Sequence, residues 1–103
     1  MKKKIFFDKN AEKELRGFVE KVQVEFEGYF LILKKEGKVD FPESKKIDKN
    51  LFELRVKFKG EYRGFYAYIG KIYIIILHFF KKKTQKTPIR NIKTAKRRLK
   101  KYE

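Results

Sequence analysis

Apolar residues in the first third of the chain recur at helical spacing. Between residues 15 and 33 they fall every three or four positions: Leu15, Phe18, Val19, Val22, Phe26, Tyr29, Phe30 and Leu33. This spacing predicts helix, with Asp8 or Asn10 as the N-cap and Gly37 as the C-terminal stop. Gly17 weakens a helix by roughly 1 kcal/mol relative to alanine. We therefore expect two helices, or one helix that breaks between residues 17 and 24.

From residue 51 onward the pattern changes from helical spacing to alternation. Apolar and charged residues alternate, with Leu54, Val56 and Phe58 on one side and Glu53, Arg55 and Lys57 on the other. This alternation predicts a half-buried strand whose outer face is charged. Two further strands, over residues 62–69 and 72–80, follow after tight turns. Three strands joined in this way form an antiparallel meander.

The remaining segments complete the expected order of elements. Residues 3–7 suit a short first strand, and residues 37–50 are typical of a polar loop. Residues 22–26 also alternate, but we prefer the helix there. Thr87 suits the N-cap and Pro88 the first position of a last helix. The apolar stripe of that helix is Ile89, Ile92, Ala95, Leu99 and Tyr102.

These elements predict an α+β fold, in which N-terminal helices and a C-terminal helix pack on a small antiparallel sheet. With 103 residues, 42% of them hydrophobic, the chain suits one domain, residues 1–103. It has no cysteine, which excludes disulfides and thiolate zinc sites. Its apolar runs are too short for a signal peptide or a membrane span. We therefore expect a soluble protein of the cytoplasm that does not enter membranes.

Positive charge is the strongest compositional signal. The chain has 29 Lys and Arg residues against 13 Asp and Glu, a formal net charge of +16. Residues 81–103 alone hold eleven of these basic residues and one acid, Glu103. A chain with this charge is expected to bind a polyanion: nucleic acid, an anionic membrane surface or an acidic protein. The last fifth of the chain is the expected contact.

Basic residues on consecutive predicted strands suggest RNA cleavage without a metal. That reaction needs a group that activates the ribose 2′-hydroxyl, cations that stabilise the phosphorane, and a proton donor for the leaving oxygen. Arg55, Arg63 and the pair Lys81 and Lys82 lie on or after three strands, so they can converge. Arginine holds phosphate oxygens with its fork. A lysine acts as the base only where neighbours depress its pKa. Solvated strand faces are the alternative interpretation.

His78 is the one histidine, and its ordinary pKa lies near neutrality. In a regular strand, its side chain would point to the same face of the sheet as those of Ile74, Ile76 and Phe80. It is therefore either a catalytic group or a satisfied histidine at the edge of the core. No carboxylate cluster accompanies it, so we expect neither a metal site nor another cofactor.

Further side chains are expected to contact RNA. Tyr66 is the aromatic residue that we select for stacking on bases, although tyrosines on strands also serve packing. The basic residues expected to bind RNA phosphates are Lys45, Lys46, Lys57, Lys83, Lys86, Arg90 and Arg97.

Three segments, LFELRV at 51–56, YRGFY at 62–66 and LHFFKKKTQKTP at 77–88, occur in this order along the chain. Together they resemble the RelE/ParE toxin superfamily, and more closely its phage-derived HigB-like branch. The similarity extends over most of the chain. It includes the helical first third, a Pro-x-x-Lys loop at 42–45 and the basic last helix.

The resemblance implies a RelE-like fold and the toxin of a type II toxin–antitoxin system. Such a toxin is a metal-independent endoribonuclease that cleaves mRNA, usually on the ribosome, and an acidic or helix-turn-helix antitoxin neutralises it. Carried onto this chain, Arg55 and Arg63 match positions that hold or polarise the scissile phosphate. Lys81 and Lys82 match a basic position after the last strand, and His78 matches a histidine typical of the branch.

The chain also departs from the family pattern. Glu53 stands where many members have a basic residue, and Pro88 falls near the place of a tyrosine that serves some relatives as acid or base. The departures concern the identity of the general base and acid. Two other functions also stay open, a ParE-like toxin on the same fold that poisons DNA gyrase and an RNA-binding protein without enzymatic activity, for which charge alone suffices. The expected partners are mRNA, the ribosome and the antitoxin. Whether the chain forms a homo-oligomer is left open.

Overall fold

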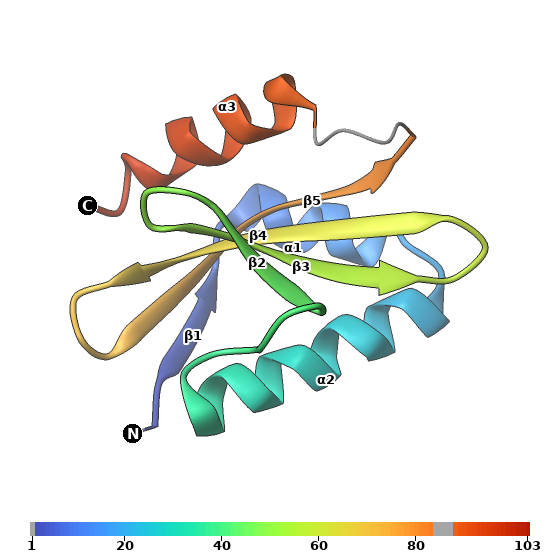
Figure 1. The fold of residues 1–103 in the computed structure, drawn as a ribbon. Coiled ribbons are helices and arrows are strands. Elements are labelled where there is room, and N and C mark those ends of the chain that lie inside the picture. Colours follow the sequence, from blue (N-terminus) through green and yellow to red (C-terminus); the bar gives the residue numbers. More distant parts are fainter. Residues whose placement is uncertain (1, 84–87) are drawn as a thin grey trace.

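The computed structural model of the protein describes residues 2–83 and 88–103. Within these residues, five strands and three helices follow one another (Figure 1). Their order is β1 (Lys4–Phe7), α1 (Lys9–Arg16), α2 (Glu20–Glu36), β2 (Ser44–Asp48), β3 (Leu51–Lys57), β4 (Glu61–Ile69), β5 (Tyr73–Lys82) and α3 (Ile89–Leu99).

The first third of the chain forms two helices, as its sequence predicts. Asp8 caps α1, and its carboxylate accepts hydrogen bonds from the backbone N–H groups of Asn10 and Ala11. The helix ends at Arg16, and α2 begins four residues later. Gly37 ends α2 with a φ of 83°, in the left-handed region that glycine adopts without strain. The alternation over residues 22–26 lies within α2 and forms no strand.

The sheet has the strand order β1-β5-β4-β3-β2. The antiparallel meander of β3, β4 and β5 is confirmed. Two expectations were incomplete. Strand β2 lies within the segment predicted to be a polar loop, and it pairs antiparallel with β3. Strand β1 pairs parallel with β5, so the sheet is mixed. Strand β2 has only five residues, which explains its weak signal in the sequence, whereas β1 forms within the residues 3–7 predicted to be a strand.

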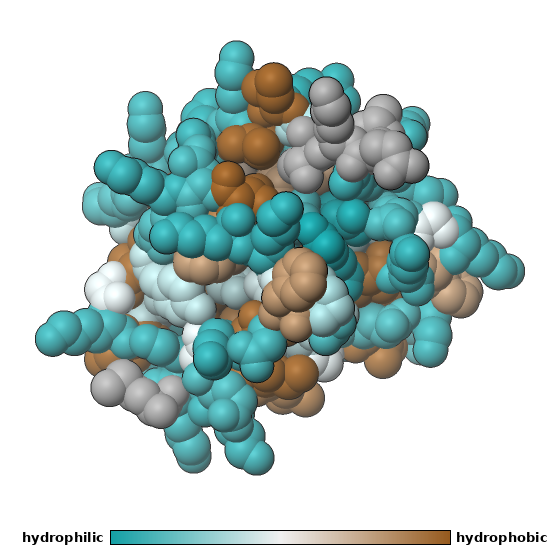
Figure 2. Space-filling view, in the orientation of Figure 1, coloured by the Kyte–Doolittle hydropathy of each residue, from teal (hydrophilic) through white to brown (hydrophobic). Residues whose placement is uncertain are grey.

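The helices cover both faces of the sheet (Figure 1). Helices α1 and α2 pack on one face, where Leu15, Phe26 and Phe79 belong to the larger core cluster. Helix α3 packs on the other face, where Ala95 and Leu99 bury against the strands. Figure 2 shows that hydrophilic side chains cover most of the visible surface, with smaller apolar patches between them. Among the described residues, no helix is long and apolar enough to cross a membrane.

A β-bulge in β5 changes the direction of its later side chains. Phe65 on β4 pairs with His78, whereas the next residue, Tyr66, pairs with Ile76. Leu77 is therefore an extra residue, and the alternation shifts by one position there. Ile76 belongs to the cluster under α1 and α2, while Leu77 belongs to the cluster under α3. The predicted shared parity of Ile76 and His78 was wrong for this reason.

Helix α3 begins one residue later than its sequence predicts. Pro88 takes the cap position with an extended backbone, and Ile89 is the first helical residue. Thr87, the predicted cap, lies outside the described residues. Ile89 is largely exposed and therefore does not extend the buried stripe, which Ile92 begins.

Candidate functional site

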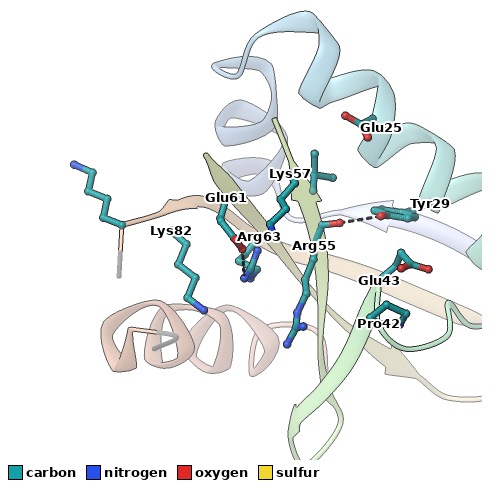
Figure 3. A pocket seen from close by; sticks show the side chains of 11 residues that line it. Glu25, Tyr29, Pro42, Glu43, Arg55, Lys57, Glu61, Arg63 and Lys82 are labelled. Carbon is teal, nitrogen blue, oxygen red and sulfur yellow. Dashed lines mark hydrogen bonds and ion pairs between the residues drawn. The ribbon is translucent and has the colours of Figure 1, made fainter. Parts of the chain in front are cut away.

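An open cleft of about 940 Å³ lies where β3, β4 and β5 present charged side chains (Figure 3). Basic residues from all three strands line one part of it, and two glutamates and a tyrosine line another. The lining residues are Glu25, Tyr29, Pro42, Glu43, Arg55, Val56, Lys57, Glu61, Arg63, Lys82 and Lys83.

Two arginines stand opposite each other in this cleft. Arg55 on β3 and Arg63 on β4 are register partners, an arrangement that is unfavourable for like charges. Glu53 lies one step along the same face of β3 and is 1% exposed. One of its carboxylate oxygens accepts a hydrogen bond of 3.2 Å from Nε of Arg55. The other lies 3.5 Å from Nε of Arg63. Glu53 therefore offsets the repulsion between the two arginines.

Arg63 is enclosed by protein groups. Its side chain is 5% exposed. Nη2 donates a 2.6 Å hydrogen bond to Glu61, and Nη1 donates a 3.3 Å hydrogen bond to the carbonyl oxygen of Tyr62. By contrast, Arg55 keeps 32% of its side chain exposed. Of the two arginines, Arg55 is the one that a ligand in the cleft reaches directly.

The two lysines at the end of β5 lie on opposite sides of the sheet. Lys82 pairs with Glu61 and lines the cleft beside the arginines (Figure 3). Lys81 pairs with Tyr62 and places its ammonium group 5.5 Å from the centre of that ring. Because Tyr62 belongs to the cluster under α1 and α2, Lys81 is separated from Lys82 by the strand itself. The structure thus brings Lys82, and not Lys81, to Arg55 and Arg63.

The other part of the cleft carries negative charge. Tyr29 on α2 donates a 2.8 Å hydrogen bond to the carbonyl oxygen of Arg55, which joins α2 to β3 (Figure 3). Burial raises the pKa of Tyr29, and the nearby carboxylates of Glu43 and Glu25 raise it further. Tyr29 therefore stays a neutral hydroxyl in this position, and the cleft is basic only on the side of Arg55.

His78 lies in a polar network between helices and not in the cleft. It is 7% exposed. Its Nδ1 lies 2.9 Å from a carboxylate oxygen of Glu14 on α1, and its Nε2 lies 2.6 Å from the amide oxygen of Asn91 on α3. These contacts match the satisfied core-edge histidine, not a group that moves protons in the cleft.

Glu14 holds this network together. Burial alone raises the pKa of its carboxyl group. The hydrogen bonds from His78, Arg98 and the backbone N–H of Phe79 outweigh burial and lower the pKa from 4.5 to about 2. Arg98 also donates a hydrogen bond to the carbonyl oxygen of Leu77, next to the bulge. The network therefore fixes α3 to α1 and to β5.

Tyr66 does not face solvent, so the expectation that it stacks on RNA bases was wrong. It is 1% exposed, and its hydroxyl lies 3.1 Å from that of Ser44. Phe52 stacks on its ring with centroids 5.3 Å apart. Tyr66 pairs with Ile76 on the face that α1 and α2 cover, which explains its burial.

The remaining basic candidates lie at different distances from the cleft. Lys57 and Lys83 line it. Lys45 is exposed and pairs with Glu53, which places it beside the arginines, whereas Lys46 extends over the ring of Phe52. Arg90 and Arg97 are exposed on α3. Lys86 lies outside the described residues.

Four charged residues that the sequence did not indicate as functional lie in or beside the cleft or in the polar network around His78. Glu53 lies on the charged side of the alternation over residues 53–58, and none of Glu14, Glu61 and Arg98 was assigned to the site. In the structure Glu53 and Glu61 each form an ion pair with Arg63, and Glu14 forms one with Arg98. The described residues contain no group of three or more histidine, cysteine or acidic side chains suited to a metal ion.

The fold is that of the RelE toxins. The chain superposes on an arginine-to-alanine double mutant of E. coli toxin RelE in the free state with a TM-score of 0.70, at 14% identity and over 100% of both chains. The isolated E. coli RelE toxin in its P21 crystal form gives a TM-score of 0.61, at 17% identity, over 94% of this chain and 98% of that chain. No curated protein matches the sequence.

The sequence itself matches a family of phage proteins. The family described as phage derived protein Gp49-like covers residues 13–100. The chain therefore belongs to the Gp49-like family, which is a family of RelE-like toxins.

Proposed function

We propose that the chain, a single toxin domain over residues 1–103, is the toxin of a type II toxin–antitoxin system and cleaves mRNA on the ribosome. The observation that carries the proposal is the convergence of Arg55, Arg63 and Lys82 from three strands on one open cleft. This arrangement suits a phosphodiester, because fixed cations stabilise the charge that develops on a pentacoordinate phosphate. Membership of a family of RelE-like toxins supports it.

In the proposed reaction the 2′-hydroxyl oxygen attacks the adjacent phosphorus atom, and the bond from phosphorus to the 5′-oxygen breaks. The 2′-hydroxyl loses a proton and the leaving oxygen gains one, which yields a 2′,3′-cyclic phosphate and a 5′-hydroxyl. In this proposal Arg55 and Lys82 stabilise the phosphorane, since both line the cleft. Lys82 is also our candidate for moving a proton, since His78 and Lys81 lie elsewhere.

The proposed partners follow from charge. Exposed basic residues line or flank the cleft, and others are exposed on α3, so both groups are available to bind phosphates of messenger and ribosomal RNA. Residues proposed for this role are Lys45, Lys57, Lys83, Arg90 and Arg97. The antitoxin is proposed to be an acidic or helix-turn-helix protein that covers this basic surface in the cytoplasm.

The test is induced expression of three chains, followed by genome-wide mapping of mRNA 5′ ends. The wild type is expected to create new ends within translated frames, and Arg55→Ala is expected to lose them. Arg16→Ala is the matched control, because Arg16 pairs with Glu27 at an exposed position of α1 away from the cleft. Arg63→Ala is unsuitable as the main variant, since the Arg63 side chain is only 5% exposed and its removal leaves a cavity beside the buried Glu53, whereas Arg55 is 32% exposed.

Each outcome decides between functions. New ends in the wild type and in Arg16→Ala, but not in folded Arg55→Ala, support the nuclease and its cleft. Growth arrest with intact messages rejects the nuclease. A DNA-damage response would then indicate a gyrase poison, and salt-sensitive RNA binding without cleavage would indicate a binding protein.

A further inference from the structure

Glu61 stands at the centre of the basic part of the cleft. It begins β4 and pairs across the sheet with Lys57 on β3 and with Lys82 on β5. One of its carboxylate oxygens accepts the 2.6 Å hydrogen bond from Nη2 of Arg63. The other lies 3.7 Å from the ammonium nitrogen of Lys57. Cations from three strands therefore surround one carboxylate (Figure 3).

The surroundings of Glu61 are those of an anion site. The hydrogen bond from Arg63 and the charges of Arg63, Lys57 and Lys82 lower the pKa of its carboxyl group. A phosphate presents oxygen atoms to the same donors in a similar geometry, and arginine binds both kinds of anion. In the structure the protein's own carboxylate thus occupies a position that also suits a phosphate oxygen.

Arg63 cannot reach a ligand while this contact exists. Its side chain is 5% exposed, so the groups around it must move before a phosphate touches it. Glu53 is buried and holds Nε from within the sheet. Glu61, in contrast, lines the cleft and keeps 40% of its side chain exposed. Of these two carboxylates, Glu61 is the one that can rotate into solvent and open Nη2.

We propose that Glu61 is an internal competitor of the RNA phosphate. In the unbound protein its carboxylate neutralises Arg63 and Lys57, and a backbone phosphate of RNA replaces it when the cleft is filled. This inference rests on the proposed function in taking RNA as the ligand. It adds that the affinity of the cleft reflects an exchange of one anion for another, so that removing the carboxylate tightens binding.

The experiment compares Glu61→Gln with Glu43→Gln. Both substitutions remove one negative charge from the lining of the same cleft, but Glu43 is exposed and forms none of the ion pairs described for Glu61. The probe is a fluorescent RNA with 2′-O-methyl groups at every position, which cannot be cleaved through its 2′-hydroxyls. Binding is measured by anisotropy at fixed salt, and thermal unfolding verifies that all chains are folded.

Glu61→Gln is expected to bind this RNA roughly fivefold more tightly than the wild type, because a charge-assisted contact no longer competes. Glu43→Gln is expected to gain clearly less. Equal gains in RNA affinity in the two variants would show that net charge alone causes the effect, and would overturn the proposal. Weaker binding by Glu61→Gln would also overturn it, since Glu61 would then shape the site for RNA.

A second probe separates this proposal from the proposed function. Inorganic pyrophosphate is titrated into the same three chains and followed by NMR. If Glu61→Gln gains affinity for pyrophosphate while no chain binds RNA, the anion site stands and the RNA function falls. If Glu61→Gln gains affinity for neither probe, the displacement of Glu61 is rejected.

Discussion

The guanidinium group of Arg98 donates two hydrogen bonds of 3.0 Å, one to each carboxylate oxygen of Glu14. The pair joins the last helix to the first across 84 positions of sequence. Tyr102 adds a second link, because its hydroxyl donates a 2.8 Å hydrogen bond to Asp8, the N-cap of α1. The C-terminal helix is thus anchored by polar contacts as well as by its apolar stripe.

Loss of this pair should destabilise the whole fold. Arg98 is 11% exposed, so Arg98→Ala leaves Glu14 with a partly buried, weakly compensated charge. We expect the free energy of unfolding to fall by about 3 kcal/mol, which lowers Tm by roughly 10 °C or more. Calorimetry measures the change, and exposed Arg97→Ala on the same helix serves as the control, with little expected effect. Equal changes in the two variants would contradict the anchoring role.

Glu14 should make stability depend on acid pH. Its pKa is lowered to about 2 in the folded protein, from an ordinary value of 4.5. The ionised carboxylate therefore stabilises the folded state fully above about pH 4.5, and this contribution is lost as the pH falls toward 2. Urea unfolding of the wild type and Glu14→Gln should show a difference that is largest near pH 6 and shrinks toward pH 2. A difference independent of pH would refute this account.

Two glycines should respond in opposite directions to the same substitution. A Cβ on Gly64 would lie 2.7 Å from the ring of Phe79 and 3.2 Å from that of Phe26, so Gly64→Ala overpacks the core. We expect it to cost about 1–3 kcal/mol. Gly28, inside α2, has nothing within 4 Å of its Cβ position, and Gly28→Ala should stabilise by roughly 0.5–1 kcal/mol. Chemical unfolding of both variants checks the signs, and destabilisation by Gly28→Ala would reveal an unrecognised packing role.

The helices and the central strands of the fold could be predicted because the spacing of hydrophobic residues differs between a helix and a strand. The change from helical spacing to alternation near residue 51 marks the boundary between α2 and the meander. The bulge at Leu77 could not be predicted, since residues 74–77 are all apolar and a continuous apolar run carries no alternation to interrupt. Because the bulge was not predicted, the side chain of His78 was expected on the same face as that of Ile76, which is wrong.

The site was only partly predictable for a related reason. Alternation places Glu53, Arg55 and Lys57 on one face of β3, but it does not tell whether that face is solvated or covered. Glu53 is buried beside Arg63, which the pairing of β3 with β4 brings next to it. The partners of an ion pair follow from register, which the sequence pattern alone does not supply.

The two adjacent lysines of β5 provide the sharpest test of the site. Lys82 lines the cleft with Arg55, whereas Lys81 extends over the ring of Tyr62 on the other face. If the cleft cleaves mRNA, Lys82→Ala should slow cleavage by roughly 10²-fold, because a cation is removed from the developing phosphorane charge.

Lys81→Ala should retain cleavage within about twofold and lose less than roughly 1 kcal/mol of stability, since an exposed cation–π contact contributes little. The measurement is the cleavage rate of a defined message in a purified translation reaction, with unfolding curves for both variants. The two chains have the same net charge and differ only in which face of β5 loses its ammonium group. Equal losses of rate would therefore indicate that bulk charge near the C-terminal end of β5 drives activity, and a larger loss in Lys81→Ala would move the site to the face that α1 and α2 cover.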